Sequence, residues 1–258
     1  MNTHPLISVI IAAFNEEGNI SKCLTTLNNQ SMPRDTYEII VIDNNSTDKT
    51  AEIAMSMGAE VANCPIQGVG PSRQMGLELA AGRYILCADA DCLYSRDWIK
   101  NLSSPLIDDI TVVVTYSAHT FIPEKGYSNT KLWIYSSLRR IMAKYKSISR
   151  PYLNVYGMSM GFRRLQGLGV GYPTTKQRGE DGRIAFDLMK YGKIKEVYAP
   201  FNTSVRSLKQ EGSLLKNVLH KVRNEIPYLM TNLFKKKPHD TKASINPSRA
   251  ASTNDVRQ

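Results

Sequence analysis

The first part of the chain alternates between short apolar runs and segments whose apolar residues recur at helical spacing. The runs have the length and β-branched content of buried parallel strands, and they cover residues 6–12, 37–42, 60–62 and 83–88. Helical spacing covers residues 17–29, a stretch from the cap-forming residues 46–48 to Gly58, and residues 68–81. This alternation predicts right-handed βαβ crossovers and an α/β fold with a mostly parallel sheet flanked by helices.

The rest of the chain is less regular. We expect a strand at 111–116, a basic amphipathic helix at 132–145, a glycine-rich loop at 167–182, a helix at 183–190 and a short strand at 195–198. Residues 214–234 have a helical pattern interrupted at Pro227. The polar residues from 235 onward are expected to be disordered.

The composition is that of a globular protein, with 42% hydrophobic and 22% charged residues in a chain of 258. The chain has no apolar run of about 18 residues and no signal-peptide pattern at its start, so we predict neither a membrane-spanning helix nor a leader. Its four cysteines form no C-x-x-C pair, which favours buried thiols in a reducing compartment. We therefore expect a cytoplasmic protein.

The formal net charge of +10 is unevenly distributed. Residues 207–258 hold ten Lys or Arg and four Asp or Glu, whereas the preceding residues hold 23 Lys or Arg and 19 Asp or Glu. The basic segment could contact anionic lipid or nucleic acid, or it could be a solvated tail. Because residues 235–258 lack the interleaved aromatic and basic residues of common nucleic-acid-binding segments, we expect no nucleic-acid partner.

Two acidic side chains directly follow the fourth predicted strand. Asp89 and Asp91 stand where ligands bind in parallel sheets. Carboxylates at this spacing repel each other unless a cation is bound, and oxygen ligands suit Mn²⁺ or Mg²⁺. Such a metal would stabilise the charge on a departing diphosphate. The alternative is a solvated turn, but the position after a buried strand favours the metal site.

Three further positions carry candidate chemistry. Asp43 follows the second strand and could accept a hydrogen bond from a nucleobase or a ribose, or act as a turn residue. Arg73 lies in the first turn of a helix, where the dipole disfavours a cation, so we expect a ligand contact or a surface salt bridge. Glu180 and Asp181 begin another helix. They could be capping residues, or one could be the general base that deprotonates an attacking hydroxyl.

Six stretches carrying these residues stand in order along the chain. They are 8–16 (SVIIAAFNE), 38–48 (EIIVIDNNSTD), 70–76 (GPSRQMG), 82–91 (GRYILCADAD), 158–164 (MSMGFRR) and 179–181 (GED). In this order they resemble the family-2 glycosyltransferases of the GT-A fold, and the resemblance covers about residues 5–206. It implies a mixed, mostly parallel, Rossmann-like sheet flanked by helices.

The resemblance also implies a division of the chain. Residues 1–206 would form a GT-A catalytic domain, with a nucleotide-sugar-binding half at about 1–115 and an acceptor half at 116–206. Residues 207–258 would form a basic helical extension that ends in a disordered tail.

Each site residue acquires an expected role from the resemblance. Asp181 would be the catalytic base of an inverting single displacement. Asp91 and Asp89 would hold Mn²⁺ or Mg²⁺, with Asp91 as the direct ligand. The residues expected to bind the nucleotide sugar are Ala13, Phe14, Glu16, Asp43, Arg73, Asp89, Ala90, Glu180 and Arg206.

The chain departs from the family pattern at three places. Gln74 stands where Asn is common. Residues 204–206 (SVR) stand where a His is common, which puts a His metal ligand in doubt and suggests that Arg206 meets the diphosphate. No Q-x-x-R-W segment occurs, so we expect a single sugar to be added.

The implied reaction moves a sugar from a nucleoside-diphosphate sugar, with a UDP-sugar favoured, to a hydroxyl acceptor in cell-envelope polysaccharide or glycolipid biosynthesis. A polyprenyl phosphate is the alternative acceptor. The amphipathic segments 132–145 and 214–234, with the lysines at 235–237, could contact the inner face of the cytoplasmic membrane and present a lipid-linked acceptor. They could instead pack on the core or form a homodimer.

Two other enzyme classes fit the residues less well. A nucleotidyltransferase would carry a glycine- and lysine-rich loop after the first strand, where residues 13–17 are acidic. A dehydrogenase would carry G-x-G-x-x-G at that place, whereas Gly68 and Gly70 lie in the third unit and are followed by Arg73.

Overall fold

The computed structural model describes residues 5–121, 129–173 and 179–204, which all belong to one compact unit spanning Met1–Gln210. The second unit, Glu211–Gln258, lies outside the described residues. Arg206 and the basic extension at 207–258 lie outside them too, so what the sequence indicates for these residues stays a prediction.

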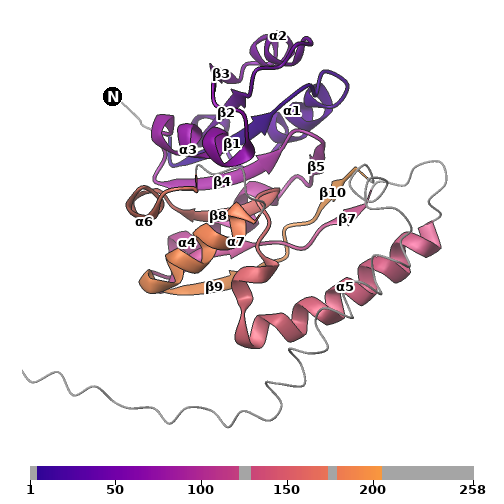
Figure 1. The fold of residues 1–258 in the computed structure, drawn as a ribbon, viewed down its shortest axis with the longest axis vertical. Coiled ribbons are helices and arrows are strands. Elements are labelled where there is room, and N and C mark those ends of the chain that lie inside the picture. Colours follow the sequence, from indigo (N-terminus) through magenta and orange to yellow (C-terminus); the bar gives the residue numbers. More distant parts are fainter. Residues whose placement is uncertain (1–4, 122–128, 174–178, 205–258) are drawn as a thin grey trace, which may run out of the picture. The chain divides into compact units, whose positions relative to one another are not determined.

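Seven strands form the main sheet in the order β3-β2-β1-β4-β8-β6-β9 (Figure 1). The strands β1 to β4 run parallel, β8 runs antiparallel to both of its neighbours, and β9 is parallel to β6. The mixed, mostly parallel sheet expected from the sequence is confirmed. The bounds are β1 Ile7–Ala13, β2 Tyr37–Asp43, β3 Glu60–Asn63, β4 Tyr84–Asp89, β6 Val112–Tyr116, β8 Ser159–Arg163 and β9 Lys193–Glu196.

The sheet is buried on both faces, which explains why its central strands read as continuous apolar runs. Val9 and Ile11 of β1 pack into one hydrophobic cluster with residues of α1 and α4. Ile10, which points the other way, packs with residues of α3 and α7. The helices are α1 Ile20–Asn28, α2 Thr50–Ser56, α3 Val69–Leu79, α4 Trp98–Asp108, α5 Asn129–Ser149, α6 Arg164–Val170 and α7 Glu180–Leu188.

Short elements complete the unit. A second sheet joins β5, β10 and β7, whose strands come from distant parts of the sequence. One-turn 3₁₀ helices follow α1, α5 and α7. The bounds are β5 Cys92–Tyr94, β7 Thr120–Phe121, β10 Phe201–Thr203, η1 Arg34–Thr36, η2 Pro151–Asn154 and η3 Met189–Tyr191.

Several predicted bounds differ in the structure. The loop expected at 167–182 is wrong at both ends, because α6 continues through Gly167 to Val170 and α7 begins at Glu180. The helix expected at 183–190 is this α7, Glu180–Leu188. A Cβ at Gly167 would lie 2.4 Å from Cε2 of Phe162, so this glycine serves close packing. The strand expected at 195–198 is β9, Lys193–Glu196, which ends two residues earlier.

Two absences expected from the composition can be compared with the described part of the chain. No helix in it is long and apolar enough to span a bilayer. The four cysteines are free and buried, as predicted. Burial raises the pKa of the Cys87 thiol to about 12, which keeps it protonated near neutral pH.

Candidate active site

The register of the strands brings the candidate residues at the ends of β1, β2 and β4 to one edge of the sheet. Ala13, the last residue of β1, pairs with Asp43 at the end of β2. On the other side of β1, Ala12 pairs with Asp89 at the end of β4. The carboxyl ends of three parallel strands therefore lie side by side, which is where ligands bind in sheets of this kind.

A cleft of about 330 Å³ opens at this edge. It takes in nearly all of the residues that the sequence marks as candidates, although they come from four separate segments of the chain. The lining residues are Ala12, Ala13, Phe14, Glu16, Asn44, Val69, Ser72, Arg73, Asp89, Ala90, Asp91, Glu180 and Asp181. Four of them are not candidates from the sequence: Ala12, Asn44 and Ser72 lie inside the quoted motifs, and Val69 adjoins one. Asp43 does not line the cleft, and its side chain is buried.

The loops after β1 and β2 hold each other in place. Asn15 adopts a left-handed conformation with φ of 53°, which Asn tolerates better than most residues. Its side-chain oxygen accepts from the backbone N–H of Thr47 at 2.8 Å. The next N–H, that of Glu16, donates to the hydroxyl of Thr50 at 2.7 Å. This bracing leaves Phe14 48% exposed at the cleft, where an aromatic ring could stack on a nucleobase.

Asp43 has one carboxylate oxygen without a partner. Its Oδ2 accepts from the N–H of Ser46 at 3.2 Å. Its Oδ1 is buried and has no hydrogen-bond partner among the described residues. A buried acceptor left unpaired is costly, so a ligand N–H or O–H at this point would be stabilising.

Asn44 is a residue that the sequence reasoning missed. Its side-chain amide donates to the carbonyls of Cys64 and Ile66, and its oxygen accepts from the N–H of Gly68 at 2.7 Å. The side chain thereby ties the end of β2 to the segment that leads into α3. Its place beside Asp43 in the same polar run was the available signal.

Arg73 connects two of the candidate carboxylates. Its side chain is 3% exposed, and its Nη2 lies 2.9 Å from Oδ1 of Asp89. Its Nη1 forms an ion pair with Asp181 and lies 3.5 Å from Glu180. These partly buried pairs at the cleft, rather than a surface salt bridge, explain the cation near the start of α3.

Gly157 gives the guanidinium of Arg73 its space. A Cβ at this position would lie 2.1 Å from Cζ of Arg73. The backbone N–H of Gly157 also donates to Oδ2 of Asp181 at 2.7 Å. Asp181 is thus held from both of its oxygens, one by Arg73 and the other by the backbone. Nothing in the sequence reasoning pointed to Gly157.

The cleft has an excess of negative charge. The pKa of Asp89 is raised to about 6, chiefly because the carboxyl is removed from water. The Arg73 guanidinium opposes this rise, whereas the charges of Asp91 and Asp181 add to it. A bound cation would relieve the repulsion between the carboxylates.

The donor atoms at the cleft fit Mn²⁺ or Mg²⁺. Asp89 and Asp91 supply only oxygen ligands, which these hard cations prefer. No group of three or more His, Cys, Asp or Glu side chains in the described residues could hold a metal by itself. Such a site would therefore need oxygens from water and substrate phosphates, which is how proteins commonly bind Mg²⁺.

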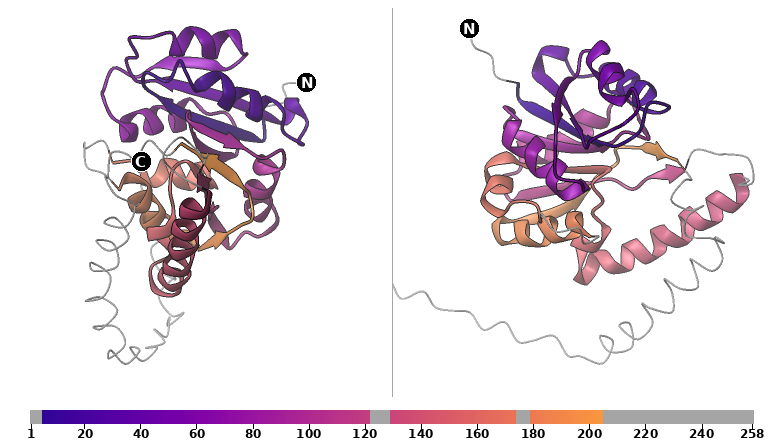
Figure 2. Two further views of the ribbon diagram at one scale, coloured as in Figure 1. Left: turned by 90° about the vertical axis from the view of Figure 1, so that its right-hand side faces the viewer. Right: turned by 45° about the horizontal axis from the view of Figure 1, so that its top comes forward.

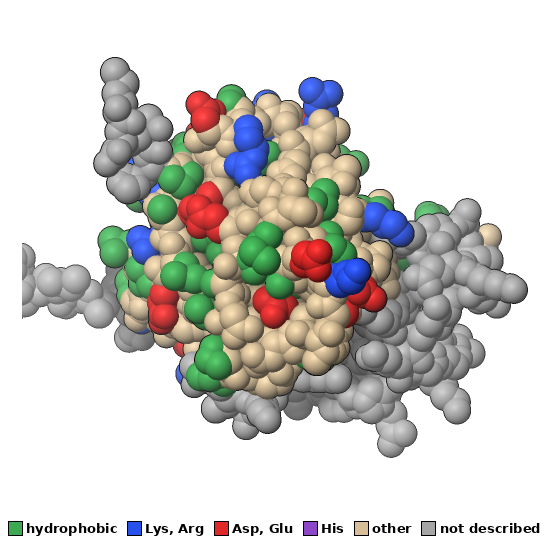
Figure 3. Space-filling model, turned by 90° about the horizontal axis from the view of Figure 1, so that it is seen from above, with side chains coloured by type: hydrophobic (Ala, Val, Ile, Leu, Met, Phe, Trp, Pro, Cys, Tyr) green, Lys and Arg blue, Asp and Glu red, His purple; other side chains and the backbone are tan. Residues whose placement is uncertain are grey.

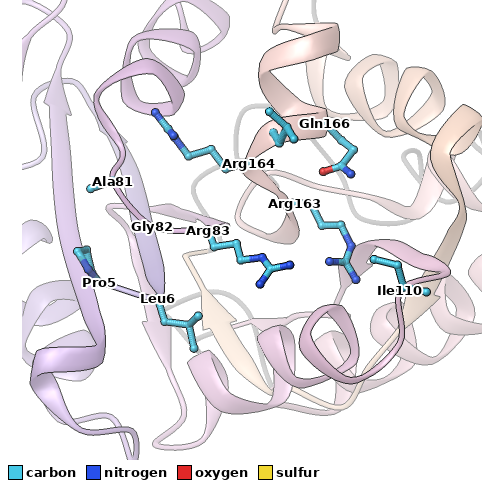
Figure 4. Close-up of a pocket in the computed structure, with 10 residues that line it drawn as sticks. Pro5, Leu6, Ala81, Gly82, Arg83, Ile110, Arg163, Arg164 and Gln166 are labelled. Carbon is cyan, nitrogen blue, oxygen red and sulfur yellow. The ribbon is translucent and has the colours of Figure 1, made fainter. Parts of the chain in front are cut away.

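A second cavity, of about 430 Å³, lies at the opposite ends of the parallel strands (Figure 4). The guanidinium groups of Arg83 and Arg163 point into it. Arg163, however, already donates to the carbonyls of Leu106, Asp109 and Val112. The cavity has no carboxylate in its lining, so it cannot supply a base or a metal ligand. The lining residues are Pro5, Leu6, Ala81, Gly82, Arg83, Ile110, Arg163, Arg164, Leu165 and Gln166.

Comparison with known sequences identifies relatives of the chain. Residues 8–165 match the family described as glycosyl transferase family 2. Glycosyltransferase AglE of Haloferax volcanii is 36% identical over 105 residues, which are 38% of this chain and 34% of that protein. A poly(ribitol-phosphate) beta-glucosyltransferase of Bacillus spizizenii is 37% identical over 92 residues, 33% of this chain and 14% of that protein. The chain thus aligns with about a third or less of the length of these curated relatives.

Solved structures show the same fold. The crystal structure of S. aureus TarS 1–349 with UDP has a TM-score of 0.59 and 19% identity, covering 77% of this chain and 60% of that one. A second structure is that of glucosyl-3-phosphoglycerate synthase from Mycobacterium tuberculosis in complex with Mn²⁺, UDP and glucosyl-3-phosphoglycerate. It has a TM-score of 0.58 and 20% identity, covering 83% of this chain and 77% of that one. The GT-A fold expected from the sequence is confirmed.

Proposed function

Since the chain belongs to glycosyl transferase family 2, we propose that it transfers a single sugar, with inversion, from a nucleoside-diphosphate sugar to a hydroxyl acceptor. One observation carries the proposal. The cleft at the carboxyl ends of β1, β2 and β4 brings together an aromatic side chain, an adjacent carboxylate pair and the carboxylate of α7. UDP is the favoured nucleotide, because TarS and glucosyl-3-phosphoglycerate synthase were both solved with it.

The donor would occupy the cleft with its base near β1 and β2. Phe14 would stack on the base. Asp43 is buried next to the cleft-lining Asn44, and its unpaired Oδ1 would accept a hydrogen bond from the base or the ribose where the bound donor reaches past the cleft lining. Asp89 and Asp91 would hold Mn²⁺ or Mg²⁺, and the metal, when bound, would neutralise charge on the leaving diphosphate. In the proposal, Ala13 and Ala90 provide the apolar wall of this pocket, and Glu16 and Glu180 complete its rim.

Asp181 is proposed as the base. Its carboxylate would take the proton of the acceptor hydroxyl while the new C1–O bond forms and the bond from C1 to the diphosphate breaks. The contacts from Arg73 and from the Gly157 N–H fix the orientation of this carboxylate before the acceptor arrives. Arg73 acts as a positioning residue, because it joins the proposed base to Asp89 at the metal site.

The relatives suggest where the product belongs. One is named for poly(ribitol-phosphate) glucosylation, and another, from Nostoc, is a beta-monoglucosyldiacylglycerol synthase, 32% identical over 106 residues. These names support a role in cell-envelope polysaccharide or glycolipid biosynthesis for this chain.

The base is tested by Asp181→Asn, compared with Asp187→Asn on the same helix. Asp187 is ion-paired with Arg183 at the surface and does not line the cleft. We expect Asp181→Asn to bind UDP normally but to lose about 10²–10⁴-fold in transfer rate, measured as acceptor-dependent UDP release. Asp187→Asn should be close to the wild type. Full turnover by Asp181→Asn would remove Asp181 as the base. Release of pyrophosphate instead of UDP would indicate a nucleotidyltransferase.

A further inference from the structure

The helix α5 is attached to the body of the protein along one face. Leu132 and Tyr135 on that face are buried, and the ring of Tyr135 lies 5.8 Å from that of Phe121, centroid to centroid. Near the other end of α5, the carbonyl of Ala143 accepts from the side chain of Asn154 at 2.7 Å. Figures 1 and 2 show the helix apart from the sheet. Several side chains on its opposite face are exposed.

That opposite face carries large apolar side chains. Trp133 is 69% exposed and Ile141 is 68% exposed, with Ile134 at 48% and Leu138 at 40%. At 3.6 residues per turn these four positions fall on one side of the helix, where they form an apolar stripe. Exposed apolar groups of this size, gathered on one element, mark a surface that meets another apolar phase.

The same helix accounts for the net positive charge of residues 1–206. The segment 129–149 has five Lys or Arg and no Asp or Glu. The other residues before 207 have 18 Lys or Arg and 19 Asp or Glu. Arg140 and Lys144 are exposed beside the apolar stripe. On the face shown in Figure 3, by contrast, acidic, basic and hydrophobic side chains are interspersed. The concentration of basic charge on α5 is thus not a general feature of the surface.

These features point to one occupant. We propose that the outer face of α5, defined by Trp133, Ile134, Leu138 and Ile141 with the flanking Arg140 and Lys144, docks the protein on an anionic lipid bilayer. An amphipathic helix with Trp on its apolar side and cations beside it binds in the interface of such bilayers. A second copy of α5, or the basic residues 207–258, would bring like charge to this face and be repelled.

The position of α5 in the chain connects this surface to the reaction. After α5 ends at Ser149, η2 leads to Gly157, whose N–H holds Asp181. The ring of Tyr152 in η2 contacts that of Phe186 in α7, the helix that begins with Glu180 and Asp181. Given the proposed function, docking through α5 would couple the bilayer to the segment that holds the base and favour a lipid-linked acceptor.

Trp133 provides a direct test of the docking. The chain has two tryptophans, and Trp98 is fully buried with its Nε1 donating to Ser159, so a change in emission on docking reports on Trp133. We expect vesicles containing phosphatidylglycerol to shift the emission of the full chain to the blue and to sediment it. Phosphatidylcholine vesicles, or high salt, should abolish both effects.

Substitutions separate α5 from the rest of the basic chain. Arg140→Glu with Lys144→Glu should weaken binding to the anionic vesicles at least tenfold, since each basic side chain near such a surface is worth a factor of about five. Lys22→Glu with Lys100→Glu is the matched control, because both lysines are exposed on other helices, α1 and α4. Vesicle binding by the double variant equal to wild type, or no binding by the wild type, would overturn the proposal.

Two further outcomes are distinguishable. A concentration-dependent dimer that Trp133→Ser abolishes, seen by light scattering without lipid, would make the face a protein interface and overturn the lipid assignment. Binding of UDP, measured without vesicles, should be unchanged in all three variants. Absence of UDP binding by the wild type would contradict the proposed function, whereas the vesicle measurements alone decide the docking.

Discussion

At the scale of single residues, the guanidinium of Arg73 fills the space over Gly157 and joins Asp89 to Asp181. We expect Gly157→Ala to displace this guanidinium, because the added Cβ would lie 2.1 Å from Cζ. A shift of about 1 Å at a catalytic group can cost on the order of 100-fold in rate, so kcat/KM for transfer should fall by about 10- to 100-fold.

Gly18→Ala is the control for this prediction, because a Cβ there would have no heavy atom within 4 Å. Its activity and its midpoint of urea unfolding should match the wild type. If Gly157→Ala retained the wild-type kcat/KM, the clamp on Asp181 would have no part in the reaction.

The residues that the sequence identified are those with recognisable chemistry next to a strand or helix end. Asp89 and Asp91 qualify by their spacing after an apolar run, and both line the cleft. Gly157 could not be found in this way, because its role depends on a side chain 84 positions away that the fold brings over it. Asn44 acts through three backbone groups of another loop, and no local pattern records those contacts.

At the scale of elements, the packing of α3 on the sheet positions Arg73. The helix approaches β1 at Gly76, where a Cβ would lie 2.4 Å from Cγ2 of Ile10 and 3.3 Å from Cγ1 of Ile42. Gly76→Ala should overpack this contact and lower the free energy of unfolding by about 1–3 kcal/mol.

Urea unfolding measures this effect as a lower midpoint with an unchanged m-value. Because α3 carries Arg73, the variant should also bind UDP less tightly at temperatures where it is folded. A midpoint equal to that of the wild type would show that α3 can move away from the sheet without cost.

Strong periodicity decided which elements could be predicted. The strands β1, β2 and β4 are apolar runs buried on both sides, and each was expected within one or two residues of its bounds. The two- and three-residue strands β5, β7 and β10 are too short to show a period. The helix α4 does have buried residues at helical spacing, but Pro105 inside it disguised the pattern.

At the scale of the whole molecule, acidic and basic side chains are concentrated in different parts of the chain. Acidic side chains gather in the cleft at one edge of the sheet, and basic ones gather on α5 and in residues 207–258. The sequence predicted the basic tail and a basic amphipathic helix at 132–145, but only the structure shows that the apolar side chains of α5 beside its cations are exposed. An acidic cleft needs a cation before it can accept a diphosphate, so nucleotide binding should depend on the metal.

Nucleotide binding with and without metal tests the central claim most directly. We would record thermal unfolding with UDP, GDP, CDP and dTDP, each with Mn²⁺ or with chelator, for the wild type and Asp91→Asn. A nucleotide at 100 times its Kd stabilises by about 2.7 kcal/mol, which for a chain of this size raises Tm by about 5–10 °C. We predict this rise for the wild type with UDP and Mn²⁺, and its loss with chelator or in Asp91→Asn. No rise with any nucleotide, or a rise that neither chelator nor Asp91→Asn reduces, would contradict the metal-dependent donor site.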